Sequence, residues 1–196
     1  MMNTASTYSV ILETGYRLFA EHGFEKTSMV MIAKEVGISK PALYYHFLSK
    51  EAIIDVLFDE ICKSIAFSNF FDPKDYTKDH FEGKLISDGL SMIGKQKEDD
   101  AYSRIMNQYQ ALGYRNPKYS QKLLEILSGF TAGFDELLRY GASIGAIEEK
   151  DTLIKAQMLT MIMDSMDNFM SYGFEYDYED IWTKTVKSLL KGDSAK

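Results

Sequence analysis

The pattern of apolar and polar positions is helical along most of the chain, and residues 27–50 show it most clearly. Thr27 is expected to cap a first short helix, because threonine is favoured at that position. One apolar face of this helix is formed by residues spaced at i, i+3, i+4 and i+7, namely Met29, Ile32, Ala33 and Val36. Gly37 follows directly, where a residue in the left-handed conformation ends a helix. The pattern therefore predicts a helix followed by a tight turn.

A second short helix is predicted after the turn. Ser39 is expected to cap it, and Pro41 lies in its first turn, where a missing N–H breaks no internal hydrogen bond. Leu43 and Phe47 are four residues apart and give this helix one buried side. Pro41, Ala42 and Tyr45 lie opposite that buried side, flanked by Tyr44 and His46, with Lys40 at the exposed start. The two tyrosines, the histidine and the lysine form poor core but good hydrogen-bonding surface. Such a pair of helices is typical of a helix-turn-helix, whose second helix enters the major groove of DNA.

The same periodicity predicts seven further helices, at about residues 5–22, 50–69, 75–95, 99–112, 117–144, 152–172 and 178–191. No stretch shows a clear strand pattern. We therefore expect an all-α fold of about nine helices. Residues 1–49 would form a three-helix helix-turn-helix DNA-binding domain, and residues 50–196 a helical effector-binding and dimerisation domain. Residues 1–4 and 192–196 are expected to be disordered.

Two glycines, Gly83 and Gly89, fall inside the helix predicted at 75–95. Each costs about 0.5–1 kcal/mol of helix stability relative to alanine, so each calls for a reason. One interpretation is close contact with another helix. The other is a segment that shifts when a ligand binds, and the sequence leaves both open.

Of the 196 residues, 45% are hydrophobic and 26% are charged, which is the composition of an ordinary globular protein. The net charge of −7 argues at first against a nucleic-acid-binding protein. However, residues 1–50 contain five basic and four acidic residues, so the acidic excess lies in the rest of the chain. An acidic body repels DNA everywhere except at the motif, which favours specific over diffuse binding.

The compartment is also suggested by composition. The chain shows no signal peptide and no long uninterrupted apolar run, so we expect a cytoplasmic protein with no membrane partner. The single cysteine, Cys62, leaves no internal disulfide.

Residues 27–50, with the helix before them, resemble the DNA-binding domain of the TetR/AcrR family of transcriptional regulators. The resemblance is carried by Leu18, Phe19, Gly23, Phe24, Thr27, Ile32, Ala33, Gly37, Ser39, Lys40, Leu43, Tyr44, Tyr45, His46, Phe47 and Lys50. The run LYYHF, followed after two residues by a lysine, is among the most specific features of the family. Two residues depart from the family pattern: Pro41 replaces a small residue, and Gly15 replaces the usual alanine.

The resemblance implies a repressor that binds a palindromic operator in double-stranded DNA as a homodimer and is released by a small-molecule effector. By residue chemistry and by this match, Tyr45, Ala42 and Pro41 would contact base edges and thymine methyl groups. Phosphates would be held by hydroxyls, helix-start N–H groups and charge, from Thr27, Ser28, Ser39, Tyr44, His46 and Lys50. Lys40 could serve either purpose.

The helices expected at 117–144 and 152–172 have apolar residues on more than one face, which suggests a partner. A twofold pairing of these helices would form a four-helix bundle, and the resemblance implies the same homodimer. An effector pocket would lie between the helices after residue 55. Its candidate residues are Phe58, Phe70, Phe71, Tyr102, Met106, Asn107, Tyr109, Gln110, Phe130, Phe134, Met161 and Asp164. They suit an apolar effector or a lipophilic cation, although core packing is the other interpretation of each residue.

A ligand-responsive regulator has two alternatives. An enzyme is not expected, because the chain has no complete P-loop, dinucleotide fingerprint or H-E-x-x-H motif, and no nucleophile elbow is expected. No catalytic residue, metal ligand or cofactor is predicted. The other alternative is a helix-turn-helix regulator without a small-molecule effector, either constitutive or controlled by a protein partner. The sequence does not separate it from the first.

Overall fold

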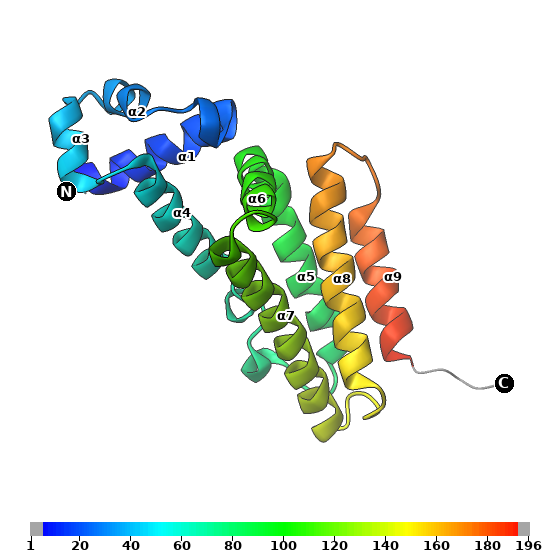
Figure 1. Cartoon of the computed structure of the whole chain (residues 1–196). Coiled ribbons are helices and arrows are strands. Elements are labelled where there is room, and N and C mark those ends of the chain that lie inside the picture. The colour runs from blue at the N-terminus through cyan, green and yellow to red at the C-terminus, as the bar shows by residue number, and fades with distance from the viewer. Residues whose placement is uncertain (1–5, 192–196) are drawn as a thin grey trace, which may run out of the picture. The chain divides into compact units, whose positions relative to one another are not determined.

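The computed structural model describes residues 6–191, apart from the side chains of Gln96 and Asp100. Within this range the chain forms nine α-helices and two short 3-10 helices and contains no strand (Figure 1). The predicted all-α fold is confirmed. The disorder predicted for residues 1–4 and 192–196 concerns residues outside the described range. Among the described helices, none combines the length and the apolarity that crossing a bilayer requires.

The helices lie close to the predicted ranges, with differences around residues 65–80. The α-helices are α1 (Thr7–Lys26), α2 (Met29–Val36), α3 (Lys40–His46), α4 (Lys50–Ser64), α5 (Phe81–Glu98), α6 (Asp100–Gly113), α7 (Pro117–Ser143), α8 (Thr152–Ser171) and α9 (Tyr178–Leu190). The 3-10 helices are η1 (Phe67–Asn69) and η2 (Pro73–Asp75).

The predicted end of one helix at residue 69 and the predicted start of the next at residue 75 are wrong. The apolar residues after Ser64 pack as an irregular segment, in which the Phe67 ring stacks on Phe71 with centroids 4.8 Å apart. The Asp72 carboxylate accepts a hydrogen bond from the Lys74 N–H at 3.0 Å, but it caps only the short η2. The chain becomes α-helical again only at Phe81.

Contacts between the helices divide the chain into two compact units. The first contains residues 6–64 and Ala101–Ser120, and the second contains Ile65–Asp100 and residues 121–191. Helices α1 to α4 and nearly all of α6 therefore belong to the first unit, whereas α5, α8 and α9 belong to the second. The predicted boundary between residues 49 and 50 separates two functions rather than two compact units, and it stays a prediction.

The core of the first unit is built by α1 to α4. Its fully buried side chains include Phe19, Ile32, Leu43 and Phe58, and α6 adds Ile105 and Tyr109. The Phe47 ring, at the end of α3, stacks on Tyr8 of α1 with ring centroids 4.8 Å apart. Helix α3 is too short to be stable alone, so this packing holds it in place.

In the second unit, α5, α8 and α9 lie side by side (Figure 1). Trp182 of α9 is fully buried, and its indole N–H donates a hydrogen bond to the Ile86 carbonyl at 3.2 Å. A Cβ atom on Gly89 would lie 2.2 Å from this indole ring, so α9 approaches α5 where only glycine fits. For Gly89 the structure supports the close-contact interpretation. At Gly83 an added Cβ atom would have no neighbour within 4 Å, so this glycine shows no such contact.

Candidate nucleic-acid interface

The turn between α2 and α3 has the predicted geometry. Gly37 adopts the left-handed conformation, with φ 78° and ψ 26°. The Ile38 N–H then donates to the Ala33 carbonyl at 3.0 Å, which closes the end of α2. The predicted cap of α2 is wrong by one residue, because the hydroxyl that accepts from the Met31 N–H, at 3.2 Å, belongs to Ser28.

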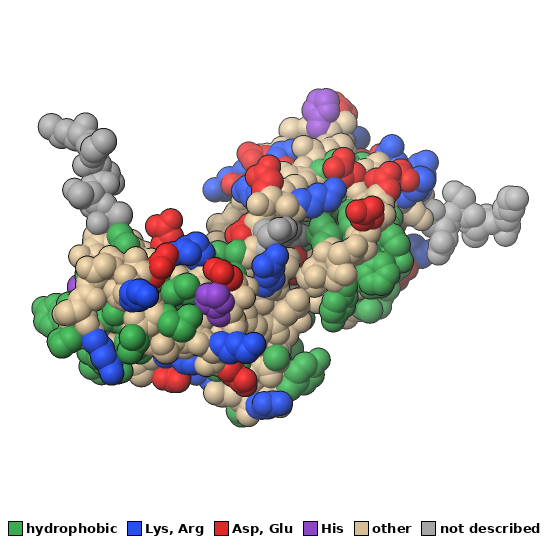
Figure 2. All heavy atoms as spheres, turned by 90° about the horizontal axis from the view of Figure 1, so that it is seen from above, with side chains coloured by type: hydrophobic (Ala, Val, Ile, Leu, Met, Phe, Trp, Pro, Cys, Tyr) green, Lys and Arg blue, Asp and Glu red, His purple; other side chains and the backbone are tan. Residues whose placement is uncertain are grey.

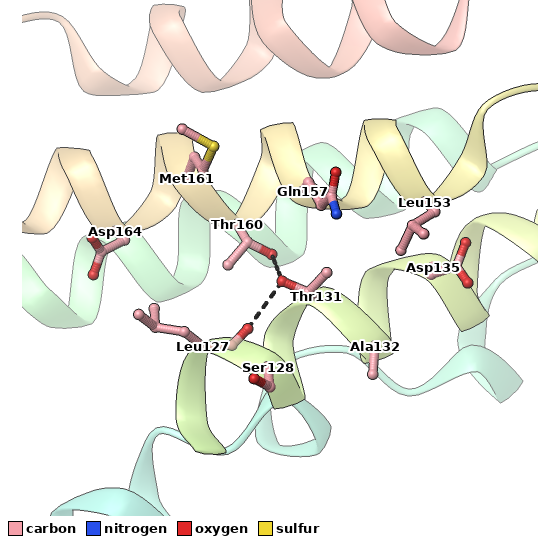
Figure 3. A pocket seen from close by; sticks show the side chains of 10 residues that line it. All are labelled: Leu127, Ser128, Thr131, Ala132, Asp135, Leu153, Gln157, Thr160, Met161 and Asp164. Carbon is pink, nitrogen blue, oxygen red and sulfur yellow. Dashed lines mark hydrogen bonds between the residues drawn. The ribbon is translucent and has the colours of Figure 1, made fainter. Parts of the chain in front are cut away.

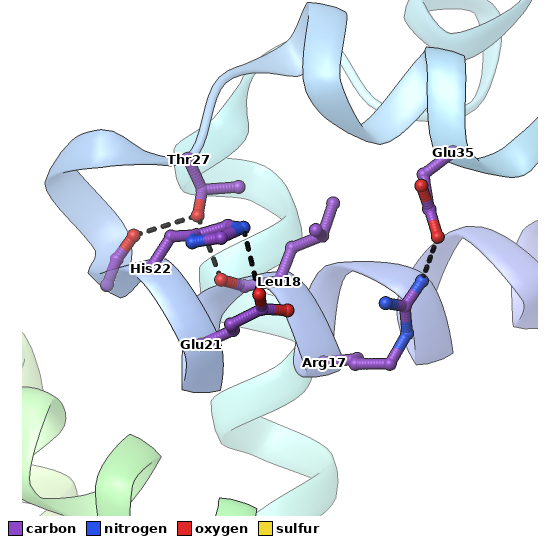
Figure 4. A network of polar contacts seen from close by, with 7 residues as sticks. Arg17, Leu18, Glu21, His22, Thr27 and Glu35 are labelled. Carbon is purple, nitrogen blue, oxygen red and sulfur yellow. Dashed lines mark hydrogen bonds and ion pairs between the residues drawn. The ribbon is translucent and has the colours of Figure 1, made fainter.

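Thr27 has a different role from the predicted one. It lies where α1 ends and is 0% exposed. Its hydroxyl lies 3.1 Å from the Leu18 carbonyl oxygen and 2.8 Å from that of Gly23 (Figure 4). Those carbonyls need a donor because α1 kinks at Gly23, whose φ of 83° is not helical. The Thr27 hydroxyl thus has internal partners, and its predicted phosphate contact stays a prediction.

The Lys50 side chain also reaches the end of α1. Its ammonium donates to the carbonyl oxygens of Phe24 at 2.5 Å and Thr27 at 3.0 Å. A cation is favourable there, because the last carbonyls of a helix carry partial negative charge. The predicted phosphate contact of Lys50 stays a prediction, and the structure adds an internal role to it.

A residue that sequence reasoning missed completes this site. The Gln108 side chain on α6 accepts a hydrogen bond from the Phe24 N–H at 2.6 Å and donates one to the Phe19 carbonyl at 3.0 Å. It thus satisfies backbone groups on both sides of the α1 kink. No local pattern could have revealed it, since Gln108 is 84 residues from Phe24 in the chain. We call Gly23, Thr27, Lys50 and Gln108 the kink junction.

Helix α3 presents the predicted residues to solvent. The Ser39 hydroxyl accepts from the Ala42 N–H at 3.3 Å, so the predicted cap is confirmed. Tyr45 is 87% exposed and Tyr44 is 39% exposed, and neither tyrosine is packed inside. The exposed face of α3 consists of Ser39, Lys40, Pro41, Tyr44 and Tyr45, with Ala42 and His46 half-buried beside it. Figure 2 shows hydrophobic side chains and Lys or Arg side chains next to each other at the surface of this unit.

An ion pair neutralises the acidic residue of α2. Arg17 of α1 and Glu35 of α2 approach to 2.5 Å, and both side chains are about half exposed (Figure 4). Such an exposed pair stabilises the fold by less than about 1 kcal/mol. The pair also changes the local charge. Arg17 of α1 offsets the negative charge of Glu35, which lies on α2, the helix directly before α3.

The candidate ligand residues do not form one set. In the first unit, Phe58 and Tyr109 stack with ring centroids 4.1 Å apart, and the Tyr109 hydroxyl donates to the Ile54 carbonyl at 2.7 Å. Burial raises the pKa of Tyr109 above that of a free tyrosine, so it stays neutral. On the same helix, Met106 is buried, and three more candidates are half-buried, namely Tyr102, Asn107 and Gln110.

The remaining candidates lie in the second unit. Phe130 and Phe134 are buried among aromatic rings, with Phe134 5.0 Å from Phe67 between centroids. Phe70 packs against the same core, and Phe71 is buried within it. By contrast, Met161 is exposed and lies with Asp164 in an open groove between α7 and α8 (Figure 3). Burial raises the pKa of the Asp164 carboxyl above its ordinary value.

This groove has a volume of about 600 Å³ and is lined by Leu127, Ser128, Thr131, Ala132, Asp135, Leu153, Gln157, Thr160, Met161 and Asp164. Sequence reasoning identified only two of these residues. The Thr131 and Thr160 hydroxyls, 3.2 Å apart, join the two helices across the groove (Figure 3). The sequence does show small and polar residues at helical spacing on both helices. It does not show that these two rows face each other.

One enzyme-like pattern is complete and another is partial, and both have the wrong structural context. Residues 141–145 read GASIG, which matches G-x-S-x-G, yet Ser143 ends a helix and its hydroxyl donates to the Tyr140 carbonyl at 2.7 Å. A nucleophile elbow instead joins a strand to a helix. Residues 89–95 read G-x-x-x-x-G-K without the final serine or threonine, and they lie inside α5 rather than in a loop.

Comparisons with known proteins agree with this geometry. Residues 11–57 match the family described as "Bacterial regulatory proteins, tetR family". The fatty acid metabolism regulator protein of Bacillus subtilis (strain 168) is 26% identical over 190 residues, which cover 94% of each chain. The HTH-type transcriptional regulator UidR of Escherichia coli (strain K12) is 30% identical over 117 residues, which are 60% of this chain and 57% of that protein.

A solved structure is similar over nearly the whole length. The transcriptional regulator FadR from Bacillus subtilis, in complex with stearoyl-CoA, superimposes with a TM-score of 0.67 and 25% identity, covering 94% of this chain and 98% of that one. The matched helix-turn-helix, the relatives and the exposed face of α3 lead to one conclusion. The chain belongs to the TetR family of bacterial regulatory proteins and is a DNA-binding transcriptional regulator.

Proposed function

We propose that this protein represses transcription by binding a palindromic operator as a homodimer, and that a small lipophilic effector releases it. The observation that carries the proposal is the exposed face of α3, where Tyr45 is 87% exposed on a helix held by Leu43 and Phe47. A large aromatic side chain held out from a rigid helix is positioned for binding rather than for folding. Here Pro41, Ala42 and Tyr45 contact bases, while Ser28, Ser39, Tyr44, His46 and Lys50 contact phosphates.

The dimer is proposed to form through α7 and α8, as the sequence predicts. Large apolar side chains outside the groove remain exposed on these two helices, including Leu124, Ile154 and Met158. Twofold pairing buries them in a four-helix bundle and brings two copies of α3 to one duplex. Recognition helices about 34–36 Å apart then read successive major grooves.

For the effector, we propose a long-chain acyl compound as the first candidate. This is supported by the similarity to FadR from Bacillus subtilis, whose structure contains stearoyl-CoA. The groove between α7 and α8, with about 600 Å³, is within the usual size of ligand sites, about 300–1,000 Å³. Leu127, Leu153 and Met161 offer it apolar walls. A lipophilic cation beside Asp164 is the other effector class to be compared.

The test uses the purified full-length chain. Selection from random duplexes is expected to enrich an inverted repeat, bound by two copies of the protein. Acyl-CoA is expected to release this complex and to raise the melting temperature of the free protein. To move the protein from 1:99 to 99:1 in favour of the state that does not bind DNA, the effector must bind that state about 10⁴-fold more tightly than the DNA-binding state. Enrichment of no duplex, or binding by a single copy, would contradict the proposal.

A regulator without an effector is the second candidate. It is favoured by Phe130 and Phe134, two predicted pocket residues that are instead buried against neighbouring rings. If neither acyl compounds nor lipophilic cations release the operator or change the melting temperature, control by a protein partner becomes the better proposal.

A further inference from the structure

The helix-turn-helix lacks most of the side chains that identify bases by hydrogen bonding. Between Ser28 and Lys50 the sequence contains no arginine, asparagine, glutamine or aspartate, and Glu35 is its only glutamate. Arginine reads guanine, the two amides read adenine, and the carboxylates read cytosine in the major groove. The Glu35 carboxylate is already paired with Arg17.

The polar groups that remain on α3 and at the two helix caps are the hydroxyls of the α3 tyrosines and of the two capping serines, the His46 imidazole and the Lys40 ammonium. The Ser28 and Ser39 hydroxyls serve as helix caps for the N–H groups of Met31 and Ala42. Lys40 is exposed at the start of α3, with its ammonium 5.7 Å from the centroid of the Tyr44 ring. Lys40 can therefore reach one guanine or one phosphate, but one lysine cannot specify a whole half-site.

Beside these polar groups, the surface offers apolar area. Tyr45 is 87% exposed, and Leu48, which directly follows the end of α3, is 86% exposed. Leu48 is held between Phe47, which is buried, and Ser49, whose hydroxyl accepts from the Ala52 N–H at 3.2 Å. Its side chain thus projects from a well-defined backbone position between α3 and α4. The apolar group that a base presents in the major groove is the C5-methyl group of thymine.

We infer that each operator half-site is read mainly through thymine methyl groups that contact Pro41, Ala42 and Tyr45, and that Leu48 is a further specificity-determining residue. The inference rests on the proposed function, because it requires α3 to lie in a major groove. It extends the predicted thymine contacts to the composition of the whole half-site, and it assigns a role to Leu48. The half-site is therefore rich in thymine on the strands that face α3, with at most one guanine contact, from Lys40.

The experiment replaces thymine by deoxyuridine in the selected operator, which removes a methyl group and leaves base pairing intact. The full-length protein is expected to lose about fourfold in affinity for each contacted methyl, the value of one buried methylene-sized group. A symmetric pair of replacements in both half-sites is then expected to cost about 16-fold.

Variants of Leu48 test its own contact. Leu48→Asn keeps the number of side-chain heavy atoms but is polar. Because both subunits of the homodimer carry the change, it is expected to lose about 16-fold in affinity and to become insensitive to deoxyuridine at one position of each half-site. Leu48→Met keeps the apolar surface and should retain that sensitivity. Because Leu48 is 86% exposed, both variants should melt like the wild-type protein.

The outcomes separate this inference from the proposed function. Specific binding that no deoxyuridine replacement weakens would overturn the thymine inference and leave the regulator intact. An unchanged deoxyuridine profile in Leu48→Asn would overturn the role of Leu48. Failure to enrich any duplex would overturn both the inference and the proposed function.

Discussion

At the residue scale, the kink junction shows how a family-specific residue can serve the fold. Lys50 belongs to the LYYHF-x-x-K run, and its charge suggests a phosphate contact. In the structure its ammonium donates to carbonyl oxygens at the end of α1. The sequence identified Lys50 as important, but its partners depend on the kink at Gly23 and on packing between α1 and α4, which have no local signature.

Replacing Lys50 by alanine tests this internal role. Lys50→Ala is expected to lower the free energy of unfolding by about 1–3 kcal/mol, because charge-assisted hydrogen bonds are lost and carbonyl groups are left without a donor. Thermal unfolding should shift downward by about 2–4 °C per kcal/mol. Lys40→Ala, at an exposed position, is the control and should not shift it. If Lys50 also contacts a phosphate, the salt dependence of DNA binding should fall by about one unit.

Gln108 is expected to be needed for the same junction. Gln108→Leu keeps the approximate size of the side chain but cannot pair with the Phe24 N–H or the Phe19 carbonyl. We expect a loss of about 1–3 kcal/mol in unfolding free energy. The specific measurement is hydrogen exchange at the Phe24 amide, which should lose protection in the variant. Unchanged exchange at this amide would show that Gln108 is not its partner in solution.

At the element scale, the sequence predicted best where the signals are local. Helices α2 and α3, their turn and the Ser39 cap follow from spacing, glycine and capping rules within 20 residues. The same rules failed between α4 and α5, because the aromatic residues after Ser64 pack against distant rings rather than continuing a helix. The groove between α7 and α8 was missed for a related reason, since its two walls are set by tertiary packing.

Helix α5 contains a matched pair of glycines for testing the close-contact interpretation. Gly89→Ala is expected to destabilise the protein by about 1–3 kcal/mol, because its Cβ would lie 2.2 Å from the buried indole of Trp182. Gly83→Ala has no neighbour to meet and should stabilise the helix by about 0.5–1 kcal/mol. Urea denaturation followed by circular dichroism measures both. Changes of the same sign and size would contradict the interpretation.

At the scale of the whole molecule, the central proposal is the twofold pairing of α7 and α8. Placing a charge among their exposed apolar residues should disrupt it, so Ile154→Glu and Met158→Glu are expected to convert a dimer into a monomer. Analytical ultracentrifugation measures the mass of each variant, and operator binding should weaken when the dimer is lost. Tyr114→Glu is the control, because Tyr114 is 92% exposed but lies outside both helices. A dimer that persists in both α8 variants would place the interface elsewhere.

The burial of Trp182 has an experimental consequence. It is the single tryptophan of the chain, and it lies wholly inside the second unit. Its fluorescence emission therefore monitors that unit selectively, whereas far-ultraviolet ellipticity sums over helices of both. Melting curves that coincide for the two signals would mean that the units unfold cooperatively, and curves that separate would give each unit its own transition.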